Sequence, residues 1–177
     1  MTAFFLGFIK VILSITIWLS GQITVFEING RLTWQTTRPE ISSICVPAAF
    51  TDSLGNIVRL KSHYGVTFTK DSFTVSKNKG DFFQLLLVNN GKIINSKDNR
   101  HFVRRALCKD KDGKMFIIQS RYPMALPYFA KILQKRYTYA VNLDMGEYGY
   151  GKVNGTPVFV CTYFTRDRQT NWICSVK

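Results

Sequence analysis

The stretch Tyr139–Gly146, which reads YAVNLDMG, decides how this chain is expected to fold. Its first five residues are apolar apart from Asn142, and they predict a buried strand that ends directly at Asp144. The preceding segment, Leu126–Arg136, has apolar residues at helical spacing and predicts a helix. With the strand predicted over Lys114–Ser120, these elements form a strand–helix–strand unit, whose two strands are either parallel or antiparallel in the sheet.

Strand signals dominate the rest of the chain. Phe82–Val88 is apolar except for Gln84 and predicts a central strand that is covered on both faces. Hairpins are predicted around Asn29-Gly30 and around Lys109–Gly113, because these residue types favour tight turns. No repeat and no linker divides the body of the chain. We therefore predict a single-domain α+β fold, a mainly β mixed-sheet structure with one or more packed helices.

The amino-terminal segment differs from the body. Met1–Leu19 is apolar apart from Lys10 and three hydroxyl residues. Val11–Leu19 fits the apolar part of an export signal, with Lys10 supplying positive charge before it. A retained membrane anchor is the alternative, which Lys10 near its middle disfavours, and a core helix is a third. We expect residues 1–21 to be a signal peptide or membrane anchor, and residues 22–177 to be the domain, exported to the periplasm, cell envelope or extracellular space.

The body contains four cysteines, an even number that is compatible with disulfides outside the cytosol. Pro157–Phe164 and Thr170–Val176 read as the two strands of a hairpin, with Cys161 opposite Cys174 at a non-hydrogen-bonded site. This register predicts a Cys161–Cys174 bridge and, by elimination, a bridge between Cys45 and Cys108; four buried thiols are the alternative. The cysteines are not spaced as zinc ligands, and no metal or cofactor is predicted.

The chain is strongly basic, with 24 Lys and Arg against 11 Asp and Glu and a net charge of +13. Such a field attracts polyanions, whether nucleic acid, anionic lipid or phosphate-bearing glycan. The basic residues are spread along the chain, and no helix-turn-helix, zinc-finger or RNP-like motif is present. We therefore expect no nucleic acid partner and contact with a membrane only through the N-terminal segment. The oligomeric state is left open.

Glycines and tyrosines follow the predicted buried strand. Asp144 stands at the carboxyl end of that strand, where ligands gather in sheets with crossover helices. Gly146 is the first of three glycines that permit close approach to the backbone, and Tyr148 between them is able to stack on a sugar. A polar strand end followed by an ordinary glycine-rich turn is the alternative.

Two adjacent arginines, Arg104 and Arg105, lie in an otherwise apolar strand. Alternation places their guanidinium groups on opposite faces, so at most one is expected to face a pocket. An inward arginine would bind phosphate oxygens with its planar fork, and a solvated arginine is the alternative. His101 is a candidate proton donor, with a structural histidine as the alternative.

Several stretches resemble the phosphodiester glycosidase family, enzymes that cleave the link between a sugar and a phosphate diester. Phe129–Gly146 (FAKILQKRYTYAVNLDMG) is similar to the family's helix followed by A-x-N-L-D-G-G, in the D-M-G form of some bacterial members. Arg104–Ser120 resembles the family's hairpin with R-R-A-L on its first strand, and Phe82–Ile94 resembles its G-F-F…N-G-K region. Thr170–Trp172 resembles a terminal T-N-W element. The resemblance extends from Pro47 to the end of the sequence.

The resemblance implies a hydrolase that acts on a sugar-1-phosphate diester of a phosphorylated glycan. Asp144 would act as general acid or base, and Glu147 and Asp81 are candidates for a second carboxylate. Arg105 or Arg104 would hold the phosphate.

The resemblance also implies substrate contacts by polar and aromatic side chains. Asn142 and Asn171 would orient sugar hydroxyls, Gly146 belongs to the strand-end motif, and Tyr148 would stack on the sugar. A non-catalytic secreted module that binds an anionic glycan through its basic surface is the alternative. A membrane-surface protein held by its N-terminal helix is a third interpretation.

Overall fold

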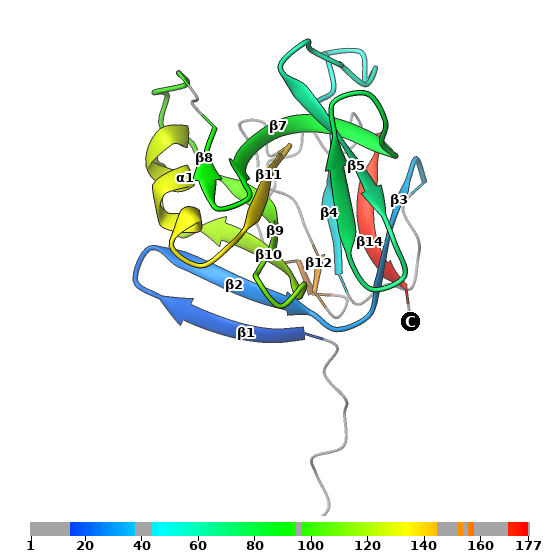
Figure 1. Cartoon of the computed structure of the whole chain (residues 1–177). Coiled ribbons are helices and arrows are strands. Elements are labelled where there is room, and N and C mark those ends of the chain that lie inside the picture. Colours follow the sequence, from blue (N-terminus) through cyan, green and yellow to red (C-terminus); the bar gives the residue numbers. More distant parts are fainter. Residues whose placement is uncertain are drawn as a thin grey trace, which may run out of the picture.

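Two β-sheets and one α-helix make up the part of the chain that the structure describes (Figure 1). The computed structural model describes residues 15–37, 44–94, 97–144, 152–153, 156–157 and 170–176. The nine-stranded sheet contains β1 (Ile15–Ser20), β2 (Ile23–Ile28), β5 (His63–Phe68), β6 (Phe73–Ser76), β7 (Phe82–Asn89), β8 (Lys92–Ile93), β9 (Arg105–Lys109), β10 (Met115–Ser120) and β11 (Tyr139–Leu143). The five-stranded sheet contains β3 (Arg31–Gln35), β4 (Ile44–Pro47), β12 (Lys152–Val153), β13 (Thr156–Pro157) and β14 (Trp172–Val176). The helix is α1 (Leu126–Gln134).

The larger sheet has the order β1-β2-β10-β9-β11-β7-β5-β6, with β8 beside β7. Both β10 and β11 pair antiparallel with β9, so these two strands are parallel to each other and β9 lies between them. Helix α1 makes the connection from β10 to β11. The two strands of the strand–helix–strand unit, β10 and β11, are therefore parallel. Strand β9, the first strand of the β9–β10 hairpin, lies between them.

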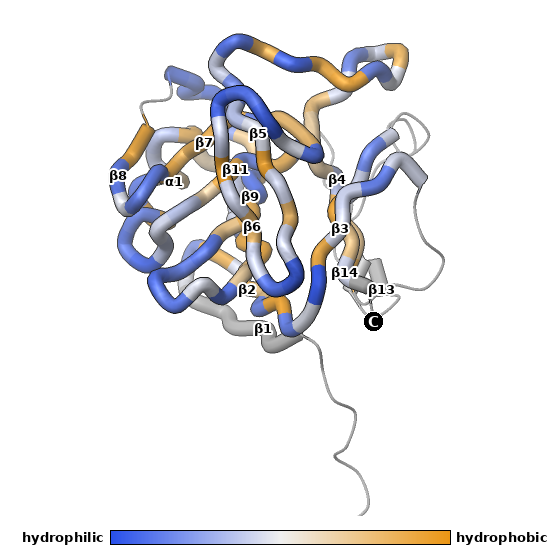
Figure 2. Tube along the Cα trace, turned by 45° about the vertical axis from the view of Figure 1, so that its right-hand side comes forward, coloured by the Kyte–Doolittle hydropathy of each residue, from blue (hydrophilic) through white to orange (hydrophobic). Residues whose placement is uncertain are grey.

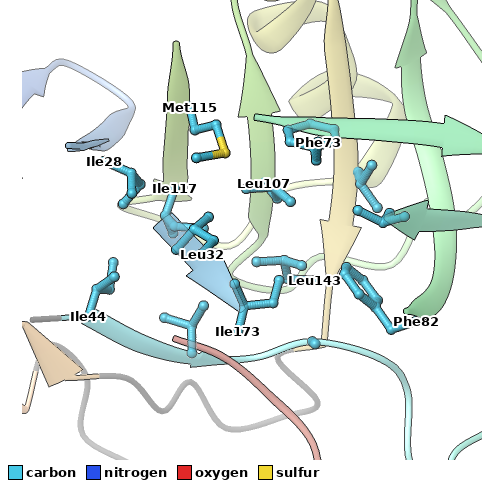
Figure 3. Close-up of a cluster of buried hydrophobic side chains, with 14 of the residues drawn as sticks. Ile28, Leu32, Ile44, Phe73, Phe82, Leu107, Met115, Ile117, Leu143 and Ile173 are labelled. Atoms are coloured by element: carbon cyan, nitrogen blue, oxygen red, sulfur yellow. The ribbon is translucent and has the colours of Figure 1, made fainter. Parts of the chain in front are cut away.

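Apolar side chains cover both faces of the larger sheet. Between the two sheets, Leu32, Ile44 and Ile173 of the smaller sheet point toward a cluster that includes Leu107 and Leu143 (Figure 3). A second cluster on the opposite face packs against α1, which buries its own apolar side chains there. Full burial of each such side chain stabilises the fold by about 1.5–3 kcal/mol. The result is a single compact domain.

The helix and the central strands confirm the local predictions. Helix α1 begins at Leu126 as expected and ends two residues before Arg136. Hairpin β9–β10 is present, and β7 buries Leu86 on the inter-sheet face and Leu87 on the helix face. Since the described residues contain one short helix, the mainly β prediction is confirmed, but the α+β description with packed helices overstated the helical part.

The hairpin predicted at Asn29-Gly30 is wrong. Strand β2 pairs with β1 on one edge and β10 on the other, which leaves no edge for β3. Strand β3 pairs with β14 instead, so the chain passes from one sheet to the other at Gly30, whose φ is 133°. Asn29-Gly30 therefore connects a strand of the larger sheet to a strand of the smaller one.

Part of the predicted leader lies in the sheet. Residues Ile15–Ser20 form β1, which pairs with β2 through a two-residue turn at Gly21-Gln22. Among the described residues, no helix is long and apolar enough to span a membrane. Export and cleavage of the leader stay predictions.

The predicted disulfides are wrong. Cys174 on β14 lies opposite Cys45 on β4, and these two cysteines form the disulfide. Both edges of β14 are occupied, by β3 and β4, so no strand containing Cys161 can pair with it. Cys161 itself lies outside the described residues. Cys108 is a buried free thiol on the helix-covered face.

Two glycines allow a close backbone crossing beside β5. A methyl group added at Gly65 would lie 2.0 Å from the carbonyl oxygen of Lys79, and one added at Gly80 would lie 2.5 Å from the Cα of Gly65. The Asp81 N–H donates to the Val66 carbonyl at 2.7 Å immediately beyond this point. Only glycine at both positions permits the backbone of β5 and the backbone of the segment before β7 to approach this closely.

We expect Gly65→Ala to lower the free energy of unfolding by about 2–3 kcal/mol, because the added methyl collides with backbone that cannot move aside. Urea denaturation monitored by circular dichroism measures this change. The matched control is Gly113→Ala, where φ is +84° but no atom lies within 4 Å, so a loss of about 1 kcal/mol is expected. Equal losses in the two variants would contradict the crossing.

Candidate functional site

Arg105 is a fully buried arginine in the middle of the larger sheet. It lies opposite Gln119 of β10 on one side and Leu143 of β11 on the other. Leu107 and Leu143 face the smaller sheet, and alternation along β9 turns Arg105 toward that same face. The guanidinium group therefore enters the space between the sheets.

The amide oxygen of Gln119 orients the Arg105 guanidinium. Its Nε and Nη2 donate to Oε1 of Gln119 at 3.1 Å and 2.9 Å. Burial lowers the pKa of Arg105 to about 9, and the nearby carboxylate of Asp144 opposes that change. The group remains cationic at neutral pH. Gln119 therefore fixes the orientation of a buried cation, the residue type that binds phosphate oxygens in proteins.

Asp144 follows β11 at the junction of the two sheets. Its side chain is buried, and its N–H donates to the carbonyl of Ala48 at 2.9 Å. Ala48 directly follows β4 of the smaller sheet. The backbone bond ties the end of β11 to the other layer and fixes the Asp144 carboxylate where its charge acts on Arg105.

Asn171 is fully buried immediately before β14. Its Oδ1 accepts hydrogen bonds from the Ala49 N–H at 2.6 Å and from Nε1 of Trp34 at 3.4 Å. Its Nδ2 donates to the Ala49 carbonyl at 3.2 Å. Ala48 is hydrogen-bonded to Asp144 and Ala49 to Asn171. The segment Ala48-Ala49 therefore connects the two predicted site residues.

Gln84 is a buried residue that sequence reasoning did not assign to the site. Leu86 and Phe82 face the inter-sheet core, so Gln84 between them faces it too. Val141 lies opposite Leu86, and extending this antiparallel register by two residues brings Gln84 level with Leu143.

The Gln84 amide is incompletely satisfied. Its Oε1 accepts from the Leu85 N–H at 2.8 Å, but its buried Nε2 has no hydrogen-bond partner among the described residues. A buried side-chain donor without a protein partner is rare in native structures. Gln119 of β10, Arg105 of β9 and Gln84 of β7 lie on one face of the sheet, with Leu143 of β11 between Arg105 and Gln84; we call these three residues the polar row. The signal was a single polar residue in an otherwise apolar central strand.

Arg104 lies on the opposite face from Arg105, as alternation predicts. Its Nε donates to the Met124 carbonyl at 3.0 Å, its Nη1 donates to Asp98 at 3.2 Å, and its Nη2 donates to the Arg100 carbonyl. Hydrogen bonding to Arg100, with Arg104 nearby, lowers the pKa of Asp98 to about 2. These contacts hold the segment before α1 in position, so the role of Arg104 is structural.

Three further candidates do not join the polar row. Asn142 is buried opposite Ala106, whose cluster packs beneath the helix, so its side chain faces away from Arg105. Asp81 is exposed, and its carboxylate accepts from the Phe68 N–H at 2.8 Å. His101 is exposed.

The remaining candidates, Gly146, Glu147 and Tyr148, lie outside the described residues. Within the ranges that are described, no three His, Cys, Asp or Glu side chains group as metal ligands.

Comparison with known proteins finds likeness in fold. No protein-family model matches the chain, and no curated protein sequence matches it. The catalytic domain of zebrafish N-acetylglucosamine-1-phosphodiester alpha-N-acetylglucosaminidase, auto-inhibited by its pro-peptide, is similar with a TM-score of 0.56 and 14% identity over 92% of this chain and 81% of that one.

A hypothetical protein from Synechocystis is similar with a TM-score of 0.57 and 10% identity. That match covers 90% of this chain but 61% of the Synechocystis protein, so the chain spans about three fifths of that relative. At these identities the likeness shows a shared fold. The fold is therefore one that a phosphodiester glycosidase catalytic domain also adopts.

Proposed function

We propose that this protein is a phosphodiester glycosidase, a hydrolase that cleaves a sugar-1-phosphate diester on an envelope or extracellular glycan. The observation that carries the proposal is the buried, cationic Arg105 beside Asp144 at the end of β11. The fold is similar to that of a glycosidase catalytic domain named for this chemistry, which supports the reaction class. Family membership, in the bacterial form with D-M-G, is part of the proposal.

Arg105 would hold the phosphate of the substrate. Gln119 fixes two of its N–H groups, which orients the guanidinium before the substrate arrives. In a buried site its attraction for a phosphate oxygen is much stronger than in water. Arg105 is preferred to Arg104 because Arg105 faces the inter-sheet side, where the charge of Asp144 acts on it, whereas Arg104 lies on the opposite face.

Asp144 would transfer the proton during cleavage of the sugar–phosphate bond. It is buried, it follows Leu143, which lies opposite Arg105, and its charge acts on Arg105. Glycosidases commonly use two carboxylates, and Glu147, three residues further along, is the preferred second one. Asp81 is less suited because its carboxylate is engaged with the Phe68 backbone.

The buried amides would shape the site in different ways. The Asn171 side-chain amide forms hydrogen bonds with the Ala49 backbone. We therefore assign Asn171 the role of positioning Ala48-Ala49 and thereby Asp144. The unpartnered Nε2 of Gln84 is a donor for a substrate oxygen. Tyr148 remains the candidate for stacking on the sugar. Export is compatible with the Cys45–Cys174 disulfide, since disulfides persist outside the cytosol.

Release of free sugar from a panel of sugar-1-phosphate diesters tests the proposal. We expect Asp144→Asn to reduce the rate by at least about a hundredfold, as removal of a general acid or base does. The matched control is Asp112→Asn, which makes the same chemical change at an exposed turn and should retain full activity.

Full activity in a folded Asp144→Asn protein would contradict the assigned role. If no member of the panel is cleaved, but the folded protein still binds a phosphorylated glycan, the non-catalytic module would replace the hydrolase.

A further inference from the structure

The loop from Thr51 to Lys61 carries an unusual set of exposed side chains. Leu54, Ile57 and Leu60 have exposed fractions of 84%, 43% and 49%. They are the large aliphatic side chains that are exposed in the described part of the chain, and all three lie on this one loop. The loop projects at the top of the molecule in Figures 1 and 2.

Hydrogen bonds hold this loop in shape. Oδ1 of Asp52 accepts from the Leu54 N–H at 2.8 Å and from the Asn56 N–H at 2.9 Å. The Val58 N–H donates to the Phe50 carbonyl at 2.8 Å and closes the base of the loop. The Asn56 side-chain amide also donates to Oδ2 of Asp52 at 3.0 Å, and this bond, with the backbone bonds, lowers the pKa of the Asp52 carboxyl group. The carboxylate form is therefore the one that maintains the turn. The aliphatic side chains are therefore held outward by a built structure.

Basic side chains surround the exposed aliphatic ones. Arg59 and Lys61 are exposed on the loop itself, and Arg59 lies 3.6 Å from the centroid of the Phe83 ring. Strand β6 pairs with β5 so that Ser76 lies opposite Gly65, which brings the exposed Lys77 and Lys79 to the end of the sheet where the loop enters β5. Lys77 lies 3.8 Å from the centroid of the Tyr64 ring.

The acidic groups described at this end are few. They are Asp52, which is bonded within the loop, and Asp81, which is bonded to the Phe68 N–H. Four exposed cations therefore outnumber two engaged carboxylates around the apolar tip.

We propose that this loop docks the protein on an anionic lipid bilayer. Leu54, Ile57 and Leu60 would enter the headgroup region, and Arg59 and Lys61 would face lipid phosphates, as in other interfacial segments that combine apolar and basic side chains. A polyanionic glycan would use the cations but gains nothing from aliphatic tips. A stable protein partner requires a much larger patch than three side chains. A bilayer is the partner that uses both features.

The docking loop is continuous with the candidate site. The carbonyl of Gly55 accepts from Oγ1 of Thr170 at 2.7 Å, and the chain before the loop contains the Ala48-Ala49 segment that holds Asp144 and Asn171. Docking would bring the site to the membrane surface. If the proposed function holds, on which this step rests, the substrate is a sugar phosphate diester linked to a lipid or held at a membrane.

Two single-cysteine substitutions in the full chain test the docking. Leu54→Cys and, as a matched control, Tyr122→Cys are labelled with an environment-sensitive nitrobenzoxadiazole dye. Tyr122 is 59% exposed, and the neighbouring Arg121 N–H donates to Gln22 in the turn of β1 and β2, at the opposite edge of the sheet from β5. Cys108 is buried and burial raises its pKa, so it does not compete for the dye. Cys161, which lies outside the described residues, is replaced by serine in both variants.

With vesicles that contain phosphatidylglycerol, we expect dye emission at position 54 to rise at least twofold and to be quenched by lipid-borne quenchers. Emission at position 122 should not change, and phosphatidylcholine vesicles alone should have no effect at either position. The proposal is overturned if the protein sediments with anionic vesicles while the dye at 54 stays in water, or if it does not bind them. The dye reports the loop whatever other segments contribute, and hydrolysis of a soluble diester is scored separately.

Discussion

Arg105→Met is expected to remove hydrolysis and much of the stability together. We expect the rate of diester cleavage to fall about a thousandfold, since a preorganised donor to the developing charge is lost. The free energy of unfolding should fall by about 3–5 kcal/mol, because the variant loses a buried cation that interacts with the Asp144 carboxylate and donates to the Gln119 oxygen. Activity per folded molecule and urea denaturation measure the two effects.

Two companion variants separate the contributions to this result. Arg105→Met combined with Asp144→Asn removes both members of the buried charge pair, so it should recover part of the lost stability but none of the activity. Arg104→Met removes a buried arginine from the opposite face and should lower stability while hydrolysis by the folded protein persists. Normal hydrolysis by folded Arg105→Met would show that the phosphate is bound elsewhere.

Removing the disulfide with Cys45→Ala and Cys174→Ala is expected to lower the free energy of unfolding by about 3–5 kcal/mol. The bridge spans a sequence separation of 129 residues, so it restricts the unfolded chain strongly. Urea denaturation under non-reducing conditions measures the loss. The matched control is Cys108→Ala, which removes a buried thiol without opening a covalent loop and should cost about 1 kcal/mol.

Peptide mapping without reduction checks the pairing itself. A fragment that joins Cys45 to Cys174 is expected. A fragment that joins Cys161 to Cys174 would restore the local hairpin predicted from the sequence and contradict the placement of β14.

Local features were predictable because their causes lie within a few residues. The spacing of Leu126, Phe129 and Leu133 determines which face of the helix is buried, and all three are buried in the structure. The apolar stretch before Asp144 ends at a carboxylate, which marks the end of β11. The alternation of Arg104 and Arg105 likewise placed them on opposite faces before any partner was known.

Long-range pairing was not predictable, because many segments compete for the same strand edge. Asn29-Gly30 has the residue types of a tight hairpin turn. The edge of β2 to which β3 would have to pair is nevertheless occupied by β10, which lies more than eighty residues later in the sequence. Cys161 and Cys174 are close in sequence, but β4 and β3 occupy both sides of β14. Local turn chemistry cannot reveal such competition.

The candidate site likewise has parts that the sequence could predict and parts that depend on long-range pairing. Asp144 could be found from its place at a strand end, whereas the choice of Arg105 over Arg104 required knowing which face meets the second sheet. Asn142 fits the motif by its sequence position, but strand alternation turns it toward the helix side. Gln84 was visible as a polar residue in an apolar strand, but its row with Arg105 depends on the register of four strands.

The central position of β14 governs when this protein can finish folding. Strands β3 and β4 are made early during synthesis, but they stay apart until the chain has been extended through Val176 and β14 fills the place between them. The smaller sheet, and with it one side of the inter-sheet core, is therefore complete only when β14 has been made. The Cys45–Cys174 disulfide then joins an early strand to a late one, β4 to β14, across a sequence separation of 129 residues.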